Sequence, residues 1–239
     1  MNLRGVSFVI TGAAGGMGRA IAPRLAAEGA SLTLADRDPA MLERLKEDLK
    51  PYAAQLLTQV ADVTDESSVH SMFEAAKAKF GGVDVLLNLA GLSIAGQIAE
   101  MPVEEYDRII DVNLKATFLC SKHFLQIADP QHNGLIVNIA SVAAKQANAN
   151  APMYCTAKAA VAMFSEGLAL HAKQKNVRVT TLMPGATDTP FWGNRKVPRE
   201  KFMQVDDVIA AIQFVLSLPP HVVVHELVFE SFEFFKHKS

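Results

Sequence analysis

The chain has 239 residues, of which half are hydrophobic and a fifth are charged, so it can bury one large core and is unlike a disordered chain. Its 23 basic and 25 acidic residues give a formal net charge of −2, which speaks against the basic surface of a nucleic-acid-binding protein. Only two cysteines occur, Cys120 and Cys155, and no apolar run is long enough to span a membrane. The first residues lead into a strand-like segment without a secretory leader. We therefore expect a cytoplasmic protein that binds neither nucleic acid nor membrane.

Short β-branched segments alternate with longer helical patterns along the whole chain. The predicted strands are residues 6–11, 31–35, 54–60, 83–87, 135–140, 178–183 and 222–229. The predicted helices are residues 17–28, 39–49, 66–79, 104–128, 152–174 and 206–216. Several strands are apolar on both faces, as the buried strands of a parallel sheet are, and no linker divides the chain. The pattern predicts a single α/β domain over residues 1–239, a three-layer, doubly wound parallel sheet of about seven strands that is Rossmann-like.

A glycine-rich stretch follows the first predicted strand and opens the first predicted helix. It reads Thr-Gly-Ala-Ala-Gly-Gly-Met-Gly over residues 11–18. Small residues let the backbone approach a pyrophosphate, and a helix N-terminus offers it free N–H groups and a partial positive charge. Asp36 ends the second strand, where a carboxylate can accept hydrogen bonds from the ribose of a dinucleotide. The order of strand, loop and helix favours a dinucleotide site; the alternatives are an ordinary tight turn for the glycines and a turn cap for Asp36.

Further motifs follow the glycine loop in order along the chain. They are Asp62-Val63, Asn88-Leu89-Ala90-Gly91, Asn113 within Asp-Val-Asn-Leu, Ser141, Tyr154-x-x-x-Lys158 and Pro184-Gly185-Ala186-Thr187-Asp188-Thr189. With the spacing Thr-Gly-x-x-x-Gly-x-Gly at residues 11–18, they resemble the short-chain dehydrogenase/reductase family over most of the chain. Leu89 departs from the family's Asn-Asn-Ala-Gly, and the phenylalanine-rich C-terminus lacks the Asp-Gly-Gly turn of many relatives.

The resemblance implies a nicotinamide dinucleotide as cofactor. The residues expected to bind it are Gly12, Gly15, Gly16, Met17, Gly18, Asp36, Arg37, Asp62, Val63, Asn88, Ala90, Gly91, Tyr154, Lys158, Pro184, Gly185, Thr187 and Thr189. NAD is expected to be preferred over NADP, because the 2′-phosphate of NADP would lie against the Asp36 carboxylate. Gly15 stands where NADP-using relatives often carry a basic residue, whereas Arg37 could meet a phosphate and complicates this expectation.

The expected catalytic residues are Asn113, Ser141, Tyr154 and Lys158. A tyrosine has a pKa near 10, so its use as a base near neutral pH requires a shift of about 3 units. Lys158 lies four residues after Tyr154 on the same helix face, and its ammonium favours the phenolate. Ser141 can hydrogen-bond the substrate oxygen, and by resemblance Asn113 holds a water that connects Lys158 to solvent. The implied reaction moves a hydride between the nicotinamide and a small secondary alcohol or ketone.

The sequence leaves two other functions open. One is the reduction of 3-oxoacyl thioesters, although residues 129–134 hold no arginine of the kind with which such relatives meet the acyl carrier. The other is a non-catalytic NAD(H) sensor, whose mark would be a broken Ser/Tyr/Lys set. A serine hydrolase is disfavoured because Ser141 lacks flanking glycines, and no metal site is expected because the seven histidines show no ligand spacing.

Two features bear on assembly and substrate. The helical patterns at 104–128 and 152–174 correspond to helices that pair across a two-fold axis in the family, which predicts a homodimer or homotetramer. Residues 190–205 are expected to form the substrate loop, a mobile lid whose four cations outnumber Glu200 and favour an anionic substrate. The cations are Arg195, Lys196, Arg199 and Lys201. The alternative is a solvated loop whose charges only keep it soluble. The C-terminal strand and aromatic tail, residues 221–239 with Phe232, Phe234 and Phe235, are expected to cover a neighbour or the chain's own core.

Overall fold

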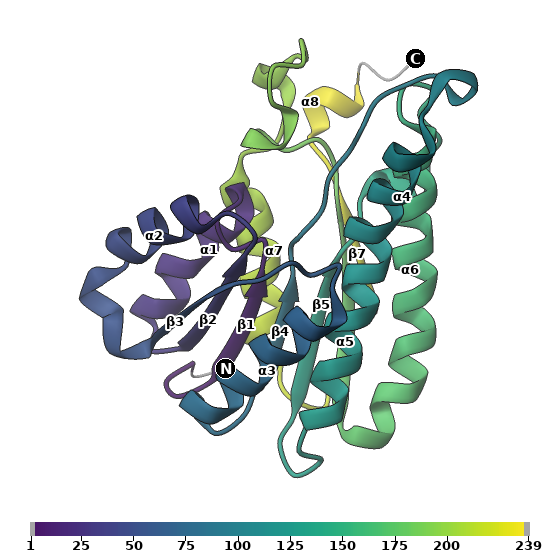
Figure 1. Ribbon diagram of the computed structural model, residues 1–239. Helices are drawn as coiled ribbons and strands as arrows, with labels where there is room; N and C mark the ends of the chain where they lie inside the picture. Colours follow the sequence, from purple (N-terminus) through teal and green to yellow (C-terminus); the bar gives the residue numbers. More distant parts are fainter. Residues whose placement is uncertain (1–2, 237–239) are drawn as a thin grey trace.

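Within residues 3–236, which the computed structural model describes, seven strands form one parallel sheet (Figure 1). They are β1 (Ser7–Thr11), β2 (Ser31–Asp36), β3 (Leu56–Val60), β4 (Val85–Asn88), β5 (Gly134–Ile139), β6 (Val177–Pro184) and β7 (Glu226–Phe229). Their order across the sheet is β3-β2-β1-β4-β5-β6-β7, and every neighbouring pair is parallel. The chain therefore winds outward from β1 to β3 in one direction and from β4 to β7 in the other. The predicted doubly wound fold is confirmed.

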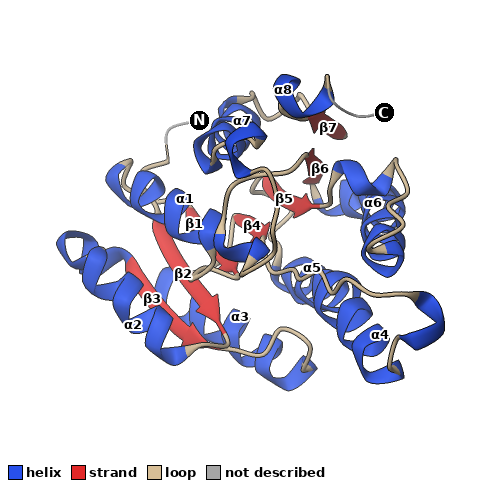
Figure 2. Ribbon diagram, turned by 90° about the horizontal axis from the view of Figure 1, so that it is seen from above, coloured by secondary structure: helices blue, strands red, loops and turns tan. Residues whose placement is uncertain are grey.

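Helices cover both faces of this sheet. Those of the described residues are α1 (Gly16–Ala27), α2 (Pro39–Asp48), α3 (Glu66–Phe80), α4 (Val103–Ile110), α5 (Ala116–Ile127), α6 (Pro152–Ala172), α7 (Val205–Ser217) and α8 (Phe232–Phe235). Buried side chains of α1, α2 and α7 pack against one face, and those of α3, α5 and α6 pack against the other. Figure 2, a view from above, shows the resulting three layers with the sheet in the middle.

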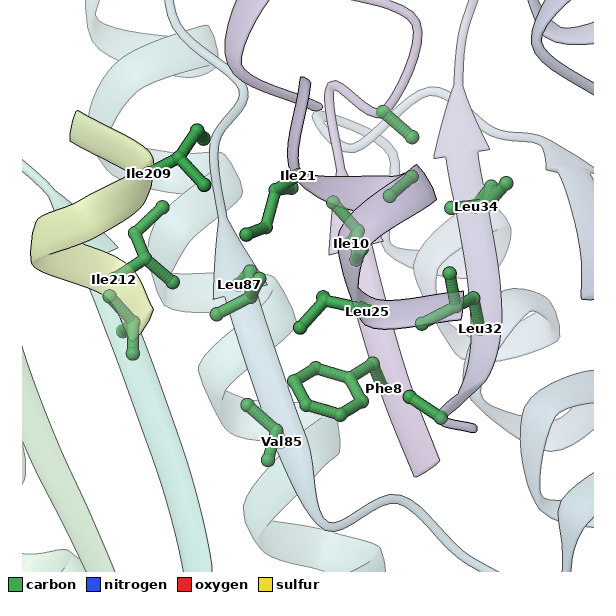
Figure 3. Close-up of a cluster of buried hydrophobic side chains, with 14 of the residues drawn as sticks. Phe8, Ile10, Ile21, Leu25, Leu32, Leu34, Val85, Leu87, Ile209 and Ile212 are labelled. Atoms are coloured by element: carbon green, nitrogen blue, oxygen red, sulfur yellow. The ribbon is translucent and has the colours of Figure 1, made fainter. Parts of the chain in front are cut away.

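The side chains of β1 alternate between two hydrophobic cores. Phe8 and Ile10 belong to the core beneath α1 and α7, and Figure 3 shows them beside Leu25 and Ile21 of α1. Val9 points to the opposite face and packs beneath α3 and α5. Because both faces of the strand are buried, apolar residues are needed at successive positions, which explains the continuous apolar runs in the sequence.

Three predicted elements differ from the structure. The predicted helix 104–128 is α4 and α5 joined by one turn of π-helix, Asp111–Lys115. The predicted strand 54–60 begins only at Leu56, because Lys50–Gln55 forms 3₁₀ turns after α2. The predicted strand 222–229 is reduced to β7, because Val222 closes a turn with Pro219 and accepts a hydrogen bond from Arg178.

Capping interactions hold the ends of several helices where the sequence placed them. The Asp38 carboxylate accepts a hydrogen bond from the Met41 N–H at 3.0 Å, and Gly81 ends α3 in the left-handed conformation. Ser231 caps α8, a short helix in a segment expected only as an aromatic tail. Residues 237–239 of that expected tail lie outside the described residues. None of the described helices is long and apolar enough to cross a membrane.

Candidate active site

Polar residues line the carboxyl ends of the central strands. Thr11 of β1 lies in register with Asn88 of β4, and Asn88 lies in register with Asn138 of β5. All three side chains are buried. The chain reverses its winding between β1 and β4, so the loops after these strands diverge and leave a place for a ligand. Most of the predicted site residues lie at this edge of the sheet or in the loops that leave it, and Asn113, Tyr154 and Lys158 reach it from helices.

The glycine loop after β1 makes two close backbone approaches. Gly12 has a φ of +64°, and a Cβ there would lie 2.9 Å from the backbone of Ala90. A Cβ on Gly18 would lie 2.4 Å from the carbonyl oxygen of Ala13, which only glycine permits. The loop is thus pressed against the segment after β4 and against the start of α1.

The N-terminus of α1 is left open to a ligand by the same loop. Its N-cap is Gly15, no side chain caps it, and no acidic residue lies in its first turn. The free N–H groups and the helix dipole of such an end suit a phosphate. Gly16, in the first turn, packs so closely on Thr189 that a Cβ there would lie 2.8 Å from the threonine Cβ. Met17 is half-buried against the first core. These residues fit the pyrophosphate of a dinucleotide.

Asp36, at the end of β2, braces the glycine loop. One carboxylate oxygen accepts the Ala14 N–H at 3.1 Å, and the other accepts the Asp38 N–H at 3.2 Å. The bond to Asp38 is the turn cap that the sequence left as an alternative, and the bond to Ala14 holds the glycine loop in addition. Arg37, next to it, is exposed.

Asp62 and Val63 follow β3 at the same edge. The Asp62 carboxylate accepts hydrogen bonds from the N–H and the hydroxyl of Thr64, at 2.9 and 2.7 Å. Val63 packs against the second core. The exposed Asp62 and the half-buried Asp36 therefore border the same end of the sheet, where the adenosine half of a dinucleotide would lie.

Ser141, Tyr154 and Lys158 are brought together by β5 and α6. The Ser141 hydroxyl lies close enough to the Tyr154 phenol to lower the pKa of that phenol by hydrogen bonding. The Lys158 ammonium donates to the Ile139 carbonyl at 2.8 Å and lies 5.8 Å from the centre of the Tyr154 ring. Lys158 is 4% exposed, so a cation is held almost out of water beside the phenol.

Burial controls the titration of this pair. It raises the pKa of Tyr154 to about 12, against the opposing effects of the Ser141 hydrogen bond and the Arg195 charge. It also lowers the pKa of Lys158 to about 8. The protein alone therefore keeps Tyr154 as a neutral phenol at neutral pH, and a further positive charge is needed to favour the phenolate.

Asn113 lies in the turn of π-helix between α4 and α5 and is fully buried. Its side-chain amide donates to the carbonyls of Leu92 and Ile109, both at 2.9 Å. A Cβ on Gly91 would lie 3.1 Å from Asn113 Oδ1 and 3.3 Å from Lys158 Nζ, so both groups flank this glycine. The turn of π-helix, which sequence reasoning missed, thus places the amide next to the lysine. A buried amide in an otherwise helical stretch was the available signal.

Sequence reasoning also missed a row of buried, hydrogen-bonded side chains formed by Asn88, Asn138 and Ser165. Asn88 donates to Asn138 at 2.8 Å, and Asn138 donates to the Ser165 hydroxyl of α6, also at 2.8 Å. It ties β4, β5 and α6 together beneath the catalytic cluster. The signal in the sequence was Asn138, the one amide inside the apolar strand Gly134–Ile139.

The loop after β6 packs next to Ser141 and Tyr154. Pro184 ends β6 and its carbonyl accepts a hydrogen bond from Ser141 at 3.4 Å. Gly185 packs so tightly on Glu230 that a Cβ there would lie 2.5 Å from the glutamate Cβ. Thr187 donates to the Gly185 carbonyl at 3.1 Å, and both Thr187 and Thr189 are buried.

Residues 190–205, which the sequence predicts to be the substrate loop, are anchored at several points. Arg199 pairs with Asp188 at 2.8 Å, and Trp192 Nε1 donates to the Thr187 carbonyl at 2.8 Å. The Phe202 ring lies 4.9 Å from Trp192 and 5.5 Å from Phe234 of α8, beside this loop at the top of Figure 1. The C-terminal segment thus packs on the chain's own loop.

Groups that would indicate other chemistry do not gather in the structure. Residues 3–236 contain no cluster of three or more His, Cys, Asp or Glu side chains that could hold a metal. Cys155, next to the tyrosine, and Cys120 are both buried and free.

Known proteins match this chain along nearly its whole length. A family profile described as short chain dehydrogenase matches residues 7–199. An uncharacterized oxidoreductase of Staphylococcus saprophyticus is 34% identical over 220 residues, which cover 92% of this chain and 94% of that protein.

Two solved structures are similar in sequence and in shape. An alcohol dehydrogenase from Thermococcus sibiricus, complexed with 5-hydroxy-NADP, is 30% identical with a TM-score of 0.86 and covers 95% of this chain and 97% of that one. A 3-ketoacyl-(acyl-carrier-protein) reductase from Brucella melitensis, complexed with NADH, is also 30% identical with a TM-score of 0.86, covering 97% and 99%. The profile, the relative and the structures agree with the motifs at the site, and the chain belongs to the short-chain dehydrogenase/reductase family of oxidoreductases.

Proposed function

We propose that the protein is an NAD(H)-dependent oxidoreductase that acts on a small secondary alcohol or the corresponding ketone. The observation that carries the proposal is the single cluster of Ser141, Tyr154, Lys158 and Asn113 next to an open, glycine-rich helix N-terminus. A phenol, a hydroxyl and a buried cation grouped in this way can move one proton, which is what hydride transfer to or from a carbinol carbon requires.

Each residue of the cluster has a distinct task in the proposed reaction. A bound nicotinamide would supply the acceptor or donor of the hydride. In the oxidation direction Tyr154 takes the hydroxyl proton of the alcohol, and the Ser141 hydroxyl hydrogen-bonds the same oxygen. Lys158 stabilises the phenolate, and the positive charge of the oxidised cofactor adds to this effect. Asn113 fixes the backbone at Leu92 and borders Lys158, where a water can pass the proton outward.

The cofactor would lie across the carboxyl ends of β1, β2 and β3. The N-terminus of α1 would hold the pyrophosphate, Asp36 the adenosine ribose, and the Asp62 segment would border the adenine. The two similar structures carry an NADP derivative and NADH, so the choice must come from this chain's own residues. The half-buried Asp36 carboxylate, already fixed by two N–H donors, disfavours a 2′-phosphate and supports a preference for NAD.

A second candidate, the reduction of 3-oxoacyl thioesters, is favoured by the similarity to the Brucella melitensis reductase. Against it stands the segment at residues 129–134, which offers no arginine to an acyl carrier. A panel of secondary alcohols and ketones beside a 3-oxoacyl thioester, followed through NADH absorbance, decides between them. If only the thioester is turned over, the second candidate replaces the first proposal. If the protein binds cofactor but turns over no substrate, the function as a non-catalytic NAD(H) sensor remains.

We also propose a cytoplasmic homo-oligomer. Two buried, free thiols suit a reducing compartment. Met163 and Leu170 on α6 are 68% and 63% exposed, and Phe118 of α5 lies beside the same helix, which leaves an apolar surface for a second copy.

The oligomer proposal predicts a molar mass of twice or four times 25.8 kDa in light scattering at micromolar concentration. Met163→Glu with Leu170→Glu should shift the mass toward one chain, because charges at an apolar interface are costly to bury. A monomer mass for the wild-type protein would end the proposal.

Tyr154→Phe is expected to lower turnover by about 10³-fold while NADH binding stays nearly unchanged, because the substitution removes only the phenol hydroxyl and leaves the other expected cofactor-binding residues in place. Steady-state kinetics and a fluorescence titration with NADH measure the two effects. Tyr106→Phe is the matched control, since Tyr106 is an exposed residue of α4, and should keep full activity. More than a tenth of wild-type turnover in Tyr154→Phe would show that another group is the base.

Asp36→Ala is expected to narrow the ratio of kcat/KM for NAD to that for NADP, which should exceed about tenfold in the wild-type protein. The carboxylate repels the 2′-phosphate and favours the free ribose hydroxyls. Asp38→Ala is the control, because Asp38 only caps α2 and its loss should leave the ratio unchanged. Equal kcat/KM values for both cofactors in the wild-type protein would contradict the assignment.

Lys158 predicts a pH dependence of stability in the cofactor-free protein. Its buried ammonium has a pKa of about 8, so between this pH and about 10.4 the unfolded chain holds a proton that the folded chain has released. Raising the pH from 7 to 9.5 should therefore stabilise the wild-type protein by about 2 kcal/mol relative to Lys158→Met, or about 5 °C in Tm. Thermal denaturation at fixed protein concentration measures this, and Lys196→Met, at an exposed position, should show no such trend. A constant Tm difference across this range would mean that Lys158 is not a buried cation.

A further inference from the structure

Arg195 of the substrate loop is fixed beside the catalytic tyrosine. Its guanidinium carbon lies 4.9 Å from the centre of the Trp192 ring and 5.2 Å from that of Phe191. Nε donates to the Trp192 carbonyl at 3.0 Å, and Nη2 donates to the Phe191 carbonyl at 2.6 Å. The Phe191 ring in turn lies 5.9 Å from the Tyr154 ring. The two rings and two carbonyls therefore hold a cation over the place where the proposed chemistry occurs.

In the part of the chain that the structure describes, Arg195 has no acidic partner, unlike Arg199 and Arg24. Arg199 of the same loop pairs with Asp188, and Arg24 pairs with Asp206, both at 2.8 Å. Arg195 forms no ion pair with any carboxylate of residues 3–236, and its hydrogen bonds engage only Nε and Nη2. A guanidinium has five N–H donors, so Nη1 and one N–H of Nη2 remain for a ligand. Their planar arrangement matches a carboxylate.

The surroundings of Arg195 strengthen its electrostatic attraction to a ligand. Aromatic faces exclude water from two sides of the guanidinium, and cation–π contacts hold it without neutralising it. The loop is anchored through Trp192, Arg199 and Phe202, so little further ordering is needed when a ligand binds. A solvated loop with charges for solubility does not explain a stacked and unpaired arginine at this position.

We propose that Arg195 selects the substrate by binding a carboxylate on it, so that the enzyme acts on small hydroxy acids and the corresponding oxo acids. The inference rests on the proposed function and names its substrate class. Arg195 lies near enough to Tyr154 that a second role, acting only through the phenol, must be distinguished from recognition. Recognition changes KM for acids alone, whereas an effect through Tyr154 changes kcat for charged and neutral substrates alike.

The first experiment compares hydroxy acids of three to six carbons with their methyl esters as substrates, at saturating NAD. Arg195→Gln should lower kcat/KM for the acids by at least about tenfold, through KM, and leave the esters within about twofold. Arg195→Lys, which keeps the charge but loses the planar fork, should fall between them. Lys196→Gln removes an exposed charge one residue away and should behave as wild type. Equal losses on acids and esters, or the same loss in Lys196→Gln, would overturn the inference.

The second experiment does not depend on turnover, because Trp192 is the sole tryptophan of the chain and stacks on Arg195. In Tyr154→Phe protein saturated with NAD, 3-hydroxybutanoate should change the Trp192 emission with a saturable curve, and its methyl ester should not. Adding Arg195→Gln should abolish the response, while unchanged circular dichroism shows that the variant is folded. A response that survives Arg195→Gln, or that the ester also produces, would sink the inference. If carboxylate binding is seen but no alcohol, hydroxy acid or ketone is turned over, the proposed function fails and the anion site stands.

Discussion

The pairing of β1 with β4 is the constraint on which the rest of the structure depends. The chain forms β1, β2 and β3 on one side and returns to place β4 on the other, so the loops after β1 and β4 leave the sheet in opposite directions. The two loops still touch where Gly12 meets the backbone of Ala90, and no larger residue than glycine fits there. The place proposed for a dinucleotide therefore follows from strand order and from one backbone contact, before any proposed catalytic side chain is considered.

Burying the polar groups of the proposed catalytic cluster costs the folded state free energy. Lys158 is buried and donates a hydrogen bond to the Ile139 carbonyl, and burial shifts its pKa in the direction that disfavours its charge. Asn113 satisfies its amide only because a turn of π-helix interrupts the α4–α5 helix. Two apolar cores, one on each face of the sheet, supply the stability that offsets these costs. The site residues sit at the end of rigid strands and on one long helix, which keeps the groups in place despite the unfavourable burial.

Local patterns in the sequence were sufficient for the strands, the helices, the glycine loop and the Tyr154/Lys158 pair. Each depends on a period of two or four residues, on a cap, or on a glycine at a turn, and such signals act over a few neighbours. The turn of π-helix at Asn113 was not predicted, because what favours it is the contact with Leu92, 21 residues away. The length of β7 and the short helix α8 were missed for a similar reason. Val222 satisfies its backbone outside the sheet, and the α8 residue Phe234 packs on Phe202.

The charges of residues 190–205 show the same limit of prediction from sequence. From the sequence, the cations of residues 190–205 were equivalent, and a solvated loop explained them as well as a ligand did. The structure separates Arg199, whose charge is used by Asp188 to anchor the loop, from Arg195, whose charge is held by aromatic rings and left without an acid. Spacing alone could not distinguish them, because the difference lies in which groups the folded loop brings within reach.

The site divides along the chain according to task. The residues expected to bind the dinucleotide lie mainly in the first three strands and the loops after them. The elements β4, β5 and α6 position the proposed proton-handling cluster. The segment after β6 covers this cluster. A continuous row of rings, Tyr154, Phe191, Trp192, Phe202 and Phe234, joins the cluster to α8 through that segment. The segment after β6 packs on Tyr154 through the Phe191 ring, whereas Lys158 and Asn113 are held by backbone carbonyls. In the proposed reaction, substrate selection would therefore fall to the segment after β6, and proton transfer to residues held by backbone carbonyls.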